Sequence, residues 1–253
     1  MDSSDTSPFR PRDINTAIAL LTRLPVKADF SRGARASWAY GMVGAVLALL
    51  AALPTAALLW LGVPPVLAAV VWLTAIVVMS GAMHEDGLAD TADGFWGGWE
   101  KARRLEIMRD SRIGAYGVIA LVLSIAARWG AITILLEADV WLFGLIAVAM
   151  LSRANMTLVM TALPHARNDG LSHAQGRAPR TGAITGFALA TVVAFGCVGI
   201  SGVVLAAVAF VMAALCSATA RVKIGGQTGD VLGATQQVTE IALLYALVIL
   251  AQL

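Results

Sequence analysis

Charged residues are scarce in this chain. Only 13% of its 253 residues are Asp, Glu, Lys or Arg, against about 25% in an ordinary soluble domain. Hydrophobic residues make up 58%, and the mean hydropathy is +0.78. The net charge is only +2 and no polybasic arm is present, which argues against nucleic acid as a partner. The composition therefore excludes a typical soluble domain and places the chain among membrane proteins.

Cysteine and histidine are also rare. The two cysteines, Cys197 and Cys216, lie in apolar runs, where they are expected to be small buried residues rather than a disulfide pair. The spacing of His84, His165 and His173 matches no zinc site. No Ser/His/Asp or Cys/His arrangement can be assigned either, so the sequence gives no support to redox, zinc or triad chemistry.

Long apolar runs dominate what is present. A hydrocarbon core about 30 Å thick needs roughly 20 apolar residues per helix. This rule predicts an all-α, polytopic integral membrane bundle with about seven transmembrane helices, in a single membrane-embedded domain over residues 1–253. The predicted spans are 38–62, 64–83, 114–136, 140–162, 183–200, 202–219 and 239–253.

The segment 1–36 precedes the first span. Within it, Asp13 is placed to cap a helix whose Ile14, Ile18 and Leu21 share one face. This pattern predicts a short amphipathic helix on the membrane surface, and a plain soluble helix is the alternative.

The basic residues test this division independently. Sixteen of the 18 Lys and Arg fall before residue 37 or within 84–113, 163–182 and 220–238, whereas the connections near 63, 137–139 and 201 carry none. By the positive-inside rule the basic regions face the cytoplasm. The sequence therefore predicts a multi-pass protein of the cell inner membrane, with a cytoplasmic N-terminus and its chemistry at the cytoplasmic face.

An acidic motif, HEDGLADTADG at 84–94, follows the second predicted span. On a helix continuing from that span, Asp86, Asp90 and Asp93 would lie within roughly 60° of arc. Carboxylates so close repel one another unless a cation lies between them, and hard oxygen ligands suit a Mg²⁺ ion that also binds phosphate. We therefore predict a metal site at these three aspartates, with a solvated acidic loop as the alternative. His84 is a candidate base or ligand, or else a cap or core residue.

The second motif is LEIMRDSRIGAYG at 105–117. Its Arg109, Asp110 and Arg112 directly precede the third span and so lie at the membrane level of the aspartates. Because a planar guanidinium can bind two phosphate oxygens at once, we predict that Arg109 and Arg112 bind substrate, and Asp110 is a functional candidate beside them. Anchoring by the positive-inside rule is the alternative.

The third motif, KIGGQTGDVLGA at 223–234, is rich in glycine. Its backbone N–H groups could form an anion-binding nest, and Asp230 could bind a metal or a ribose hydroxyl. Gly225, Gly226, Gln227 and Asp230 are therefore predicted to bind substrate.

Two arginines lie inside predicted spans, and an ionisable residue there marks a functional site by default. Arg153, with Asn155 nearby, is expected to point toward a cytoplasmic cavity and bind substrate. Arg128 is expected either to pair with Glu137 or to reach outward to the interface.

Five motifs together resemble one family. LLTRLPV, HEDGLADTADG, LEIMRDSRIGAYG, SRANM and GGQTGDVLGA occur in this order along the whole chain. The set is similar to the cobalamin synthases, the adenosylcobinamide-GDP ribazoletransferases of bacteria. Their acidic motif usually reads His-Leu-Asp-Gly-Leu-Ala-Asp, and Glu85 replaces the leucine here.

The resemblance implies an enzyme for the last stage of cobalamin nucleotide-loop assembly. It would transfer adenosylcobinamide phosphate from adenosylcobinamide-GDP to α-ribazole or α-ribazole 5′-phosphate, release GMP and require Mg²⁺. Its implied partners are the lipid bilayer and other cobalamin-assembly enzymes. In this mechanism the three predicted aspartates hold Mg²⁺ on the diphosphate and the three predicted arginines steady its oxygens. Asp110 or His84 relays the proton of the attacking ribose hydroxyl.

Two other functions are alternatives. CDP-alcohol phosphotransferases also place aspartates at the inner edge of a helix bundle, but this chain lacks their Asp-Gly-x-x-Ala-Arg run. A membrane transporter could use the arginines and the acidic cluster as a relay path. Against it, the chain has no pair of matching interrupted helices in two halves.

Overall fold

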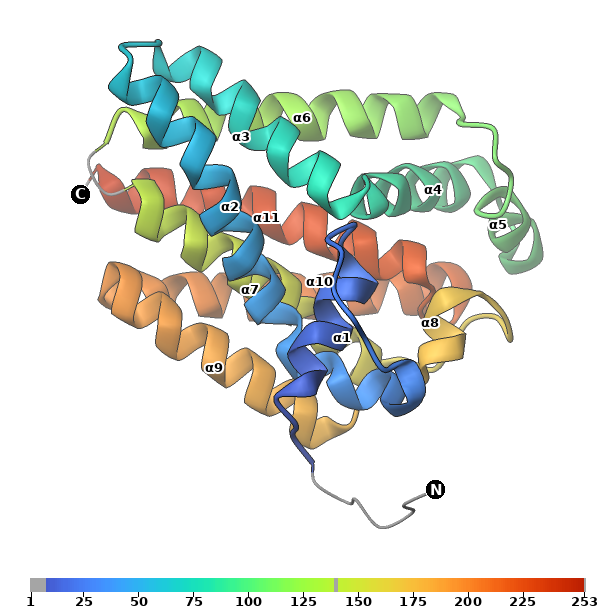
Figure 1. Ribbon diagram of the computed structural model, residues 1–253. Coiled ribbons are helices and arrows are strands. Elements are labelled where there is room, and N and C mark those ends of the chain that lie inside the picture. Colours follow the sequence, from blue (N-terminus) through green and yellow to red (C-terminus); the bar gives the residue numbers. More distant parts are fainter. Residues whose placement is uncertain (1–7, 139–140, 253) are drawn as a thin grey trace.

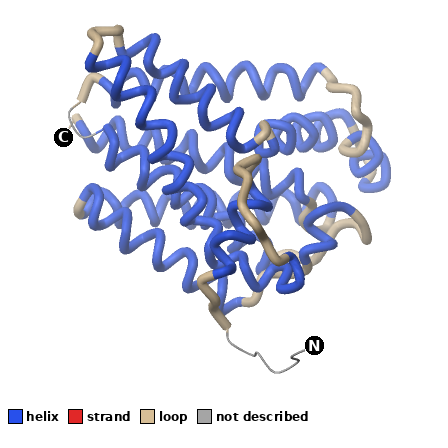
Figure 2. Tube along the Cα trace, viewed as in Figure 1, coloured by secondary structure: helices blue, strands red, loops and turns tan. Residues whose placement is uncertain are grey.

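A computed structural model describes residues 8–138 and 141–252 of the chain (Figure 1). The described residues form helices, turns and one isolated β-bridge, without a strand among them, so the all-α prediction is confirmed (Figure 2). In chain order the helices are α1 (Arg12–Leu21), the 3₁₀ segment η1 (Phe30–Ala39), α2 (Tyr40–Trp60), α3 (Pro65–Ser80), α4 (Met83–Gly97), α5 (Lys101–Ile107), α6 (Ala115–Leu136), α7 (Trp141–Ala162), α8 (Gly170–Gln175), α9 (Arg180–Val198), α10 (Ile200–Ile224) and α11 (Gly229–Ala251).

The helix lengths and the outer surface fit a membrane. Six helices are long and apolar enough to cross one, and α3 with α4 makes a seventh, bent candidate. Large apolar side chains such as Val122, Phe195 and Phe210 are more than half exposed on the outside of α6, α9 and α10. Lipid matches such a surface, whereas water does not. The prediction of a multi-pass protein with about seven spans is therefore confirmed.

Helix α7 forms the centre of the bundle. It packs against α2, α9, α10 and α11, and most of its side chains are buried. The α2–α3 and α9–α10 turns lie at one end of the bundle, on the left in Figure 1, and α5 and α8 lie at the other end. We call this second end the charged end and define it by α5, α8 and residues 225–228. The arrangement agrees with the alternation of the basic regions along the sequence.

The acidic motif lies on a helix of its own. α3 ends at Ser80, and α4 leaves it at an angle of 85° after Gly81 and Ala82. These two residues have positive φ angles of 65° and 55°, a conformation that glycine adopts readily and that costs an alanine roughly 1–2 kcal/mol. The predicted continuous helix from the second span into the motif is therefore wrong.

Helix α4 packs closely between α6 and α11 (Figure 1). A β-carbon at Gly87 would lie 2.8 Å from the Asp230 carbonyl oxygen, and one at Gly233 would lie 3.2 Å from the His84 Cα. Glycine at both positions lets the α4 and α11 backbones touch. This contact brings the acidic motif beside Asp230.

Helix α11 begins ten residues before the predicted last span, and Leu253 of that span lies outside the described residues. Thr228 caps the helix, since its Oγ1 accepts a hydrogen bond from Val231 N at 3.3 Å. The observed connection between α10 and α11 therefore covers only residues 225–228 and is shorter than the predicted one, 220–238. Gln236, Gln237 and Glu240 lower the hydropathy of the first half of α11, yet all three are buried inside the bundle.

Helix α1 lies where the amphipathic helix is predicted, with Ile18 and Leu21 buried on its inner face, and its place at the membrane surface stays a prediction. The predicted cap is wrong: Pro11 takes the N-cap position, and Asp13 lies in the first turn. The buried Asp13 carboxylate accepts hydrogen bonds from Arg32 Nε at 2.7 Å and Trp38 Nε1 at 2.8 Å, and so ties α1 to η1. Residues 1–7 of the predicted N-terminal segment lie outside the described residues.

Candidate functional site

A cavity of about 140 Å³ lies at the charged end, between α1, α4, α7, α8 and the first turn of α11. We call it the α4–α11 cavity. Its wall has two parts of different chemistry. The polar part is formed by His84, Asp86, Arg167, Ser172, Gln175 and Asp230. The apolar part is formed by Leu20, Leu21, Tyr40, Met83, Met156 and Met160.

Three carboxylates gather at the polar part of this wall. Asp86 and Asp230 line the cavity, and Asp90 is half-buried one turn of α4 beyond Asp86. The negative charges of Asp86, Asp230 and Asp93 all act on Asp90, and Arg167 acts on it with the opposite sign. The structure thus joins the acidic motif to Asp230 of the glycine-rich motif.

This donor set suits a hard cation. Mg²⁺ prefers oxygen ligands, keeps several waters and usually shares the oxygens of substrate phosphates. Residues 8–138 and 141–252 contain no group of three His, Cys, Asp or Glu side chains placed to hold a metal ion by themselves. A metal ion here would take one or two carboxylates from Asp86, Asp90 and Asp230 and would need its other oxygen ligands from a diphosphate and water, so the magnesium site stays a prediction.

Asp93 has a different set of contacts from Asp86 and Asp90. Its Oδ2 accepts a hydrogen bond from Gly114 N at 2.7 Å, and its Oδ1 accepts one from Gly117 N at 2.9 Å. These amides belong to the first turn of α6, where N–H groups lack partners within the helix and a negative charge is favourable. Asp93 therefore holds the start of α6 against α4, and its role as a metal ligand stays a prediction.

Arg167 is a cavity residue that the sequence interpretation missed. It lies in the connection after α7, and its side chain is only 14% exposed. Its Nη2 lies 3.3 Å from Asp230 Oδ2, and its Nε lies 3.3 Å from Asp169 Oδ1. The available signal was an arginine in PHARNDG, but spacing alone did not distinguish it from Arg177 or Arg180.

The glycine-rich connection 225–228 packs against the connection that carries Arg167. Gln227 N donates to Pro164 O at 2.8 Å, and Ala166 N donates to Gln227 O at 2.9 Å. Gly226 is buried in the same contact. The predicted substrate contacts of Gly225, Gly226 and Gln227 stay predictions, and the observed contacts hold the Arg167 connection in place.

The buried Gln227 side chain extends this contact. Its Oε1 accepts a hydrogen bond from Ser172 Oγ at 2.7 Å, and its Nε2 lies 2.9 Å from His165 Nδ1. Burial, together with the charges of His173 and Arg177, lowers the pKa of His165. A neutral His165 ring can accept the amide hydrogen of Gln227, so this contact is favoured at neutral pH.

The predicted residues of the second motif lie on the exposed connection between α5 and α6, outside the cavity wall. Arg109 forms an ion pair with Asp169, which also contacts Arg167. The Asp110 carboxylate accepts hydrogen bonds from Arg112 N at 3.1 Å, Nε at 3.2 Å and Nη2 at 2.9 Å, and these bonds lower the pKa of Asp110. The predicted roles of Arg109, Asp110 and Arg112 in binding and catalysis stay predictions.

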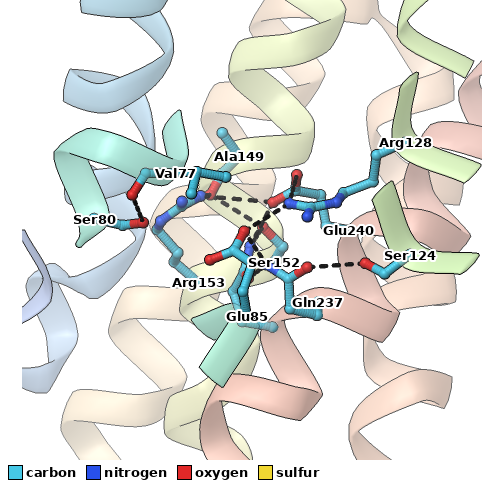
Figure 3. Close-up of polar contacts among 11 residues, drawn as sticks. Val77, Ser80, Glu85, Ser124, Arg128, Ala149, Ser152, Arg153, Gln237 and Glu240 are labelled. Atoms are coloured by element: carbon cyan, nitrogen blue, oxygen red, sulfur yellow. Dashed lines mark hydrogen bonds and ion pairs between the residues drawn. The ribbon is translucent and has the colours of Figure 1, made fainter. Parts of the chain in front are cut away.

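A second group of charges lies in the interior of the bundle (Figure 3). Arg128 Nη1 lies 2.9 Å from Glu85 Oε1 and 3.7 Å from Glu240 Oε1, and Arg153 Nη1 lies 3.9 Å from Glu240 Oε2. The two arginines are almost fully buried. We call these four residues the buried ion network. Its two cations and two anions balance, as charges buried in a membrane protein require.

Amide and hydroxyl side chains surround this network (Figure 3). Gln237 Nε2 donates to Glu85 Oε1 at 3.1 Å, and Ser124 Oγ donates to Gln237 Oε1 at 3.1 Å. Gln236 donates to Glu240 and, at 3.2 Å, to Ser152 Oγ. These polar contacts join α4, α6, α7 and α11 in the interior of the bundle.

The interior placement corrects the expectation for Arg128, whereas the predicted substrate-binding roles of Arg153 and Asn155 stay predictions. Arg128 pairs with Glu85. It does not pair with Glu137, and it does not reach the membrane interface, because its side chain is buried. Arg153 and Asn155 point into the bundle interior and do not line the α4–α11 cavity, and Asn155 Nδ2 donates to Thr239 Oγ1 at 2.8 Å. The acidic partners on α4 and α11, which the sequence did not reveal, attract the arginines inward.

Comparison with known proteins gives a match over nearly the whole chain. The sequence profile of the cobalamin-5-phosphate synthase family matches residues 13–248. An adenosylcobinamide-GDP ribazoletransferase of Bradyrhizobium diazoefficiens is 41% identical over 239 residues, which cover 92% of this chain and 91% of that protein.

Two further relatives have the same name. The one from Azorhizobium caulinodans is 41% identical over 255 residues, covering 95% of this chain and 96% of its own. The one from Sinorhizobium medicae is 42% identical over 253 residues, covering 93% and 95%. No solved structure matches the chain. The chain therefore belongs to the cobalamin-5-phosphate synthase family.

Proposed function

We propose that the chain is an adenosylcobinamide-GDP ribazoletransferase. It transfers adenosylcobinamide phosphate from adenosylcobinamide-GDP to α-ribazole or α-ribazole 5′-phosphate and releases GMP. The family match over residues 13–248 carries this proposal. The α4–α11 cavity supports it, because carboxylates from two motifs and Arg167 meet there. The match does not favour a lipid phosphotransferase or a transporter.

Transfer from a diphosphate is mainly a matter of position and charge. The reacting phosphoryl group and the leaving GMP both carry negative charge, which metal ions, arginines and backbone N–H groups can neutralise. In the proposed site one or two of the carboxylates of Asp86, Asp90 and Asp230 would hold Mg²⁺, which would supply positive charge to the diphosphate. Arg167 and the first turn of α11 line the same space and add positive potential.

The two predicted proton relays, His84 and Asp110, differ in whether they can contact a substrate bound in the cavity. His84 lines the cavity, so a bound substrate can contact it directly. Asp110 lies on the α5–α6 connection, and its lowered pKa makes it a weak proton acceptor. Of the two residues, His84 is therefore the one that we place in contact with substrate.

The proposal includes the location of the site. With the charged end at the cytoplasmic face of the cell inner membrane, both substrates reach the cavity from the cytoplasm and GMP returns there. Other cobalamin-assembly enzymes could dock at this face. Sixteen of the 18 basic residues on one side of the predicted spans support this orientation.

The test measures GMP release by purified protein in detergent or liposomes. We expect release only when adenosylcobinamide-GDP, α-ribazole phosphate and Mg²⁺ are all present. Asp86→Asn should lower the rate by about 10²–10³-fold, because one charge that positions the metal is lost. Glu106→Gln is the matched control, since Glu106 is an exposed carboxylate paired with Arg103. Absence of release from folded wild-type protein would refute the transferase, and release that persists in EDTA would refute the metal.

A further inference from the structure

His84 is a buried polar side chain without a partner for one of its nitrogens. It lies on α4, is 1% exposed and lines the α4–α11 cavity. Its Nε2 is buried and makes no hydrogen bond to any described residue. A buried polar atom without a partner costs free energy, and a ligand that supplies the missing hydrogen bond recovers it. His84 therefore favours a ligand that brings a hydrogen-bonding atom deep into this cavity.

The apolar wall shows what kind of group can accompany that atom. Met83, Met156 and Met160 lie in the same wall as Leu21 and Tyr40. Methionine side chains are flexible and make favourable sulfur contacts with aromatic rings. A wall of this kind suits a flat, uncharged aromatic ring and disfavours phosphate.

The size of the cavity agrees with a ring. Its volume is about 140 Å³, and an apolar cavity of about 150 Å³ in another protein is known to bind benzene. Its polar part carries Asp86, Arg167 and Asp230. A ring held against the apolar wall could therefore extend a sugar and its phosphates toward these charges.

We infer that the α4–α11 cavity binds the heteroaromatic base of the ribazole substrate, and that His84 Nε2 donates a hydrogen bond to the unsubstituted ring nitrogen of that base. The inference rests on the proposed function and makes it more specific. It gives His84 a binding role in place of the proton relay. The ribose of the nucleoside then lies between the base and the acidic cluster, where its hydroxyl can meet the diphosphate.

The other bulky groups of the two substrates fit this cavity less well. A corrinoid ring is far larger than the cavity. Guanine carries donors and acceptors on several edges, and the methionine and leucine side chains would leave most of them without partners. The benzimidazole base of ribazole has an apolar rim and a single free ring nitrogen, which matches the unpartnered His84 Nε2 beside the apolar wall. Arg167 Nη1 and Gln175 Oε1 are buried polar atoms of the same cavity without a hydrogen-bond partner among the residues that the structure describes, and they remain for the ribose and phosphate groups.

The test measures binding without turnover. The full-length protein in detergent is titrated with α-ribazole in the absence of adenosylcobinamide-GDP. The same titration is made with an analogue in which a C–H group replaces the unsubstituted ring nitrogen. Wild-type protein should bind the analogue at least about tenfold more weakly, since a hydrogen bond to a buried group is lost.

Two variants sharpen this test. His84→Ala should bind α-ribazole at least about tenfold more weakly and should no longer distinguish it from the analogue. His84→Gln, which keeps an N–H donor, should retain part of the preference. His173→Ala is the matched control, because His173 is exposed at the charged end.

The outcomes separate this inference from the proposed function. Equal binding of α-ribazole and the analogue by wild-type protein that releases GMP would overturn the inference and leave the function intact. This comparison needs no variant, so a folding defect in His84→Ala cannot obscure it. Lack of both ribazole binding and GMP release in folded protein would overturn both.

Discussion

Helices α4 and α11 each carry two kinds of carboxylate, and the comparison between them shows how position separates structure from chemistry. Glu85 and Asp86 are neighbours on α4, yet Glu85 pairs with Arg128 in the interior and Asp86 faces the cavity. On α11, Glu240 belongs to the buried ion network and Asp230 lines the cavity. The interior carboxylates have buried cationic partners and hold helices together, whereas at the cavity Arg167 faces Asp230 and the aspartates of α4 repel one another, which suits a ligand.

The comparison also changes how an arginine inside a span is interpreted. Considered alone, each of Arg128 and Arg153 is a functional-site candidate, and Arg153 is predicted to bind substrate. In the structure two glutamates balance their charges within the bundle, and the substrate-binding role of Arg153 stays a prediction. Arg167 lies in a connection at the charged end and is the arginine that lines the cavity.

Arg128→Leu should have the largest effect on stability, because it leaves the interior carboxylate Glu85 buried without its cation. We expect the free energy of unfolding to fall by about 3–5 kcal/mol, measured by thermal or denaturant unfolding in detergent. The double variant Glu85→Leu with Arg128→Leu removes both charges, keeps the Arg153–Glu240 pair and should recover most of the loss. A double variant no more stable than Arg128→Leu would show that the unpaired charge of Glu85 is not the cause of the loss.

Asp93→Ala tests whether Asp93 belongs with the carboxylates that hold helices together or with those that are suited to bind a metal. Loss of the bonds to Gly114 N and Gly117 N should lower the free energy of unfolding by about 1 kcal/mol. The Mg²⁺ concentration needed for half-maximal GMP release should remain near the wild-type value, whereas Asp86→Asn should raise it. Equal shifts in Asp93→Ala and Asp86→Asn would assign Asp93 to the metal site, as its spacing on α4 predicted.

Arg112→Ala should have the smallest effect, because its pair with Asp110 is exposed. Without the hydrogen bonds from Arg112, the lowered pKa of Asp110 should rise toward its ordinary value, which NMR titration of the carboxyl carbon can follow. Asp110 is ionised at neutral pH in both proteins, and the contact is lost only as the pH falls through the lowered pKa. GMP release at neutral pH should therefore fall less than about tenfold, and a loss of about 10²-fold would make Arg112 a substrate-binding residue after all.

Most of the fold could be predicted because lipid imposes a simple rule on helix length. The runs that became α6, α7 and α9 were located to within a few residues. The α3–α4 bend could not be predicted, since it depends on an alanine with positive φ. The start of α11 was also missed, because hydropathy cannot show that Gln236 and Gln237 find partners on other helices.

The candidate site was predictable where one helix or one motif carries it. Spacing alone placed Asp86 and Asp90 on one face of α4. The contact with Asp230 depends on close packing of α4 against α11 at Gly87 and Gly233. The capping contact of Asp93 and the position of Arg167 depend on how connections fold back over the bundle, and no local pattern in the sequence encodes that.

The buried ion network has a consequence for how the protein is made. Glu85 emerges 43 residues before Arg128 and 152 residues before Gln237. Lipid offers no partner to a carboxylate, so α4 has no stable place in the bilayer until α6 and α11 have entered it. The bend at Gly81 and Ala82 makes α4 a helix separate from α3, so α4 can remain at the membrane surface while α3 inserts into the bilayer. We therefore expect the helix that carries the acidic motif to take its place last during biogenesis.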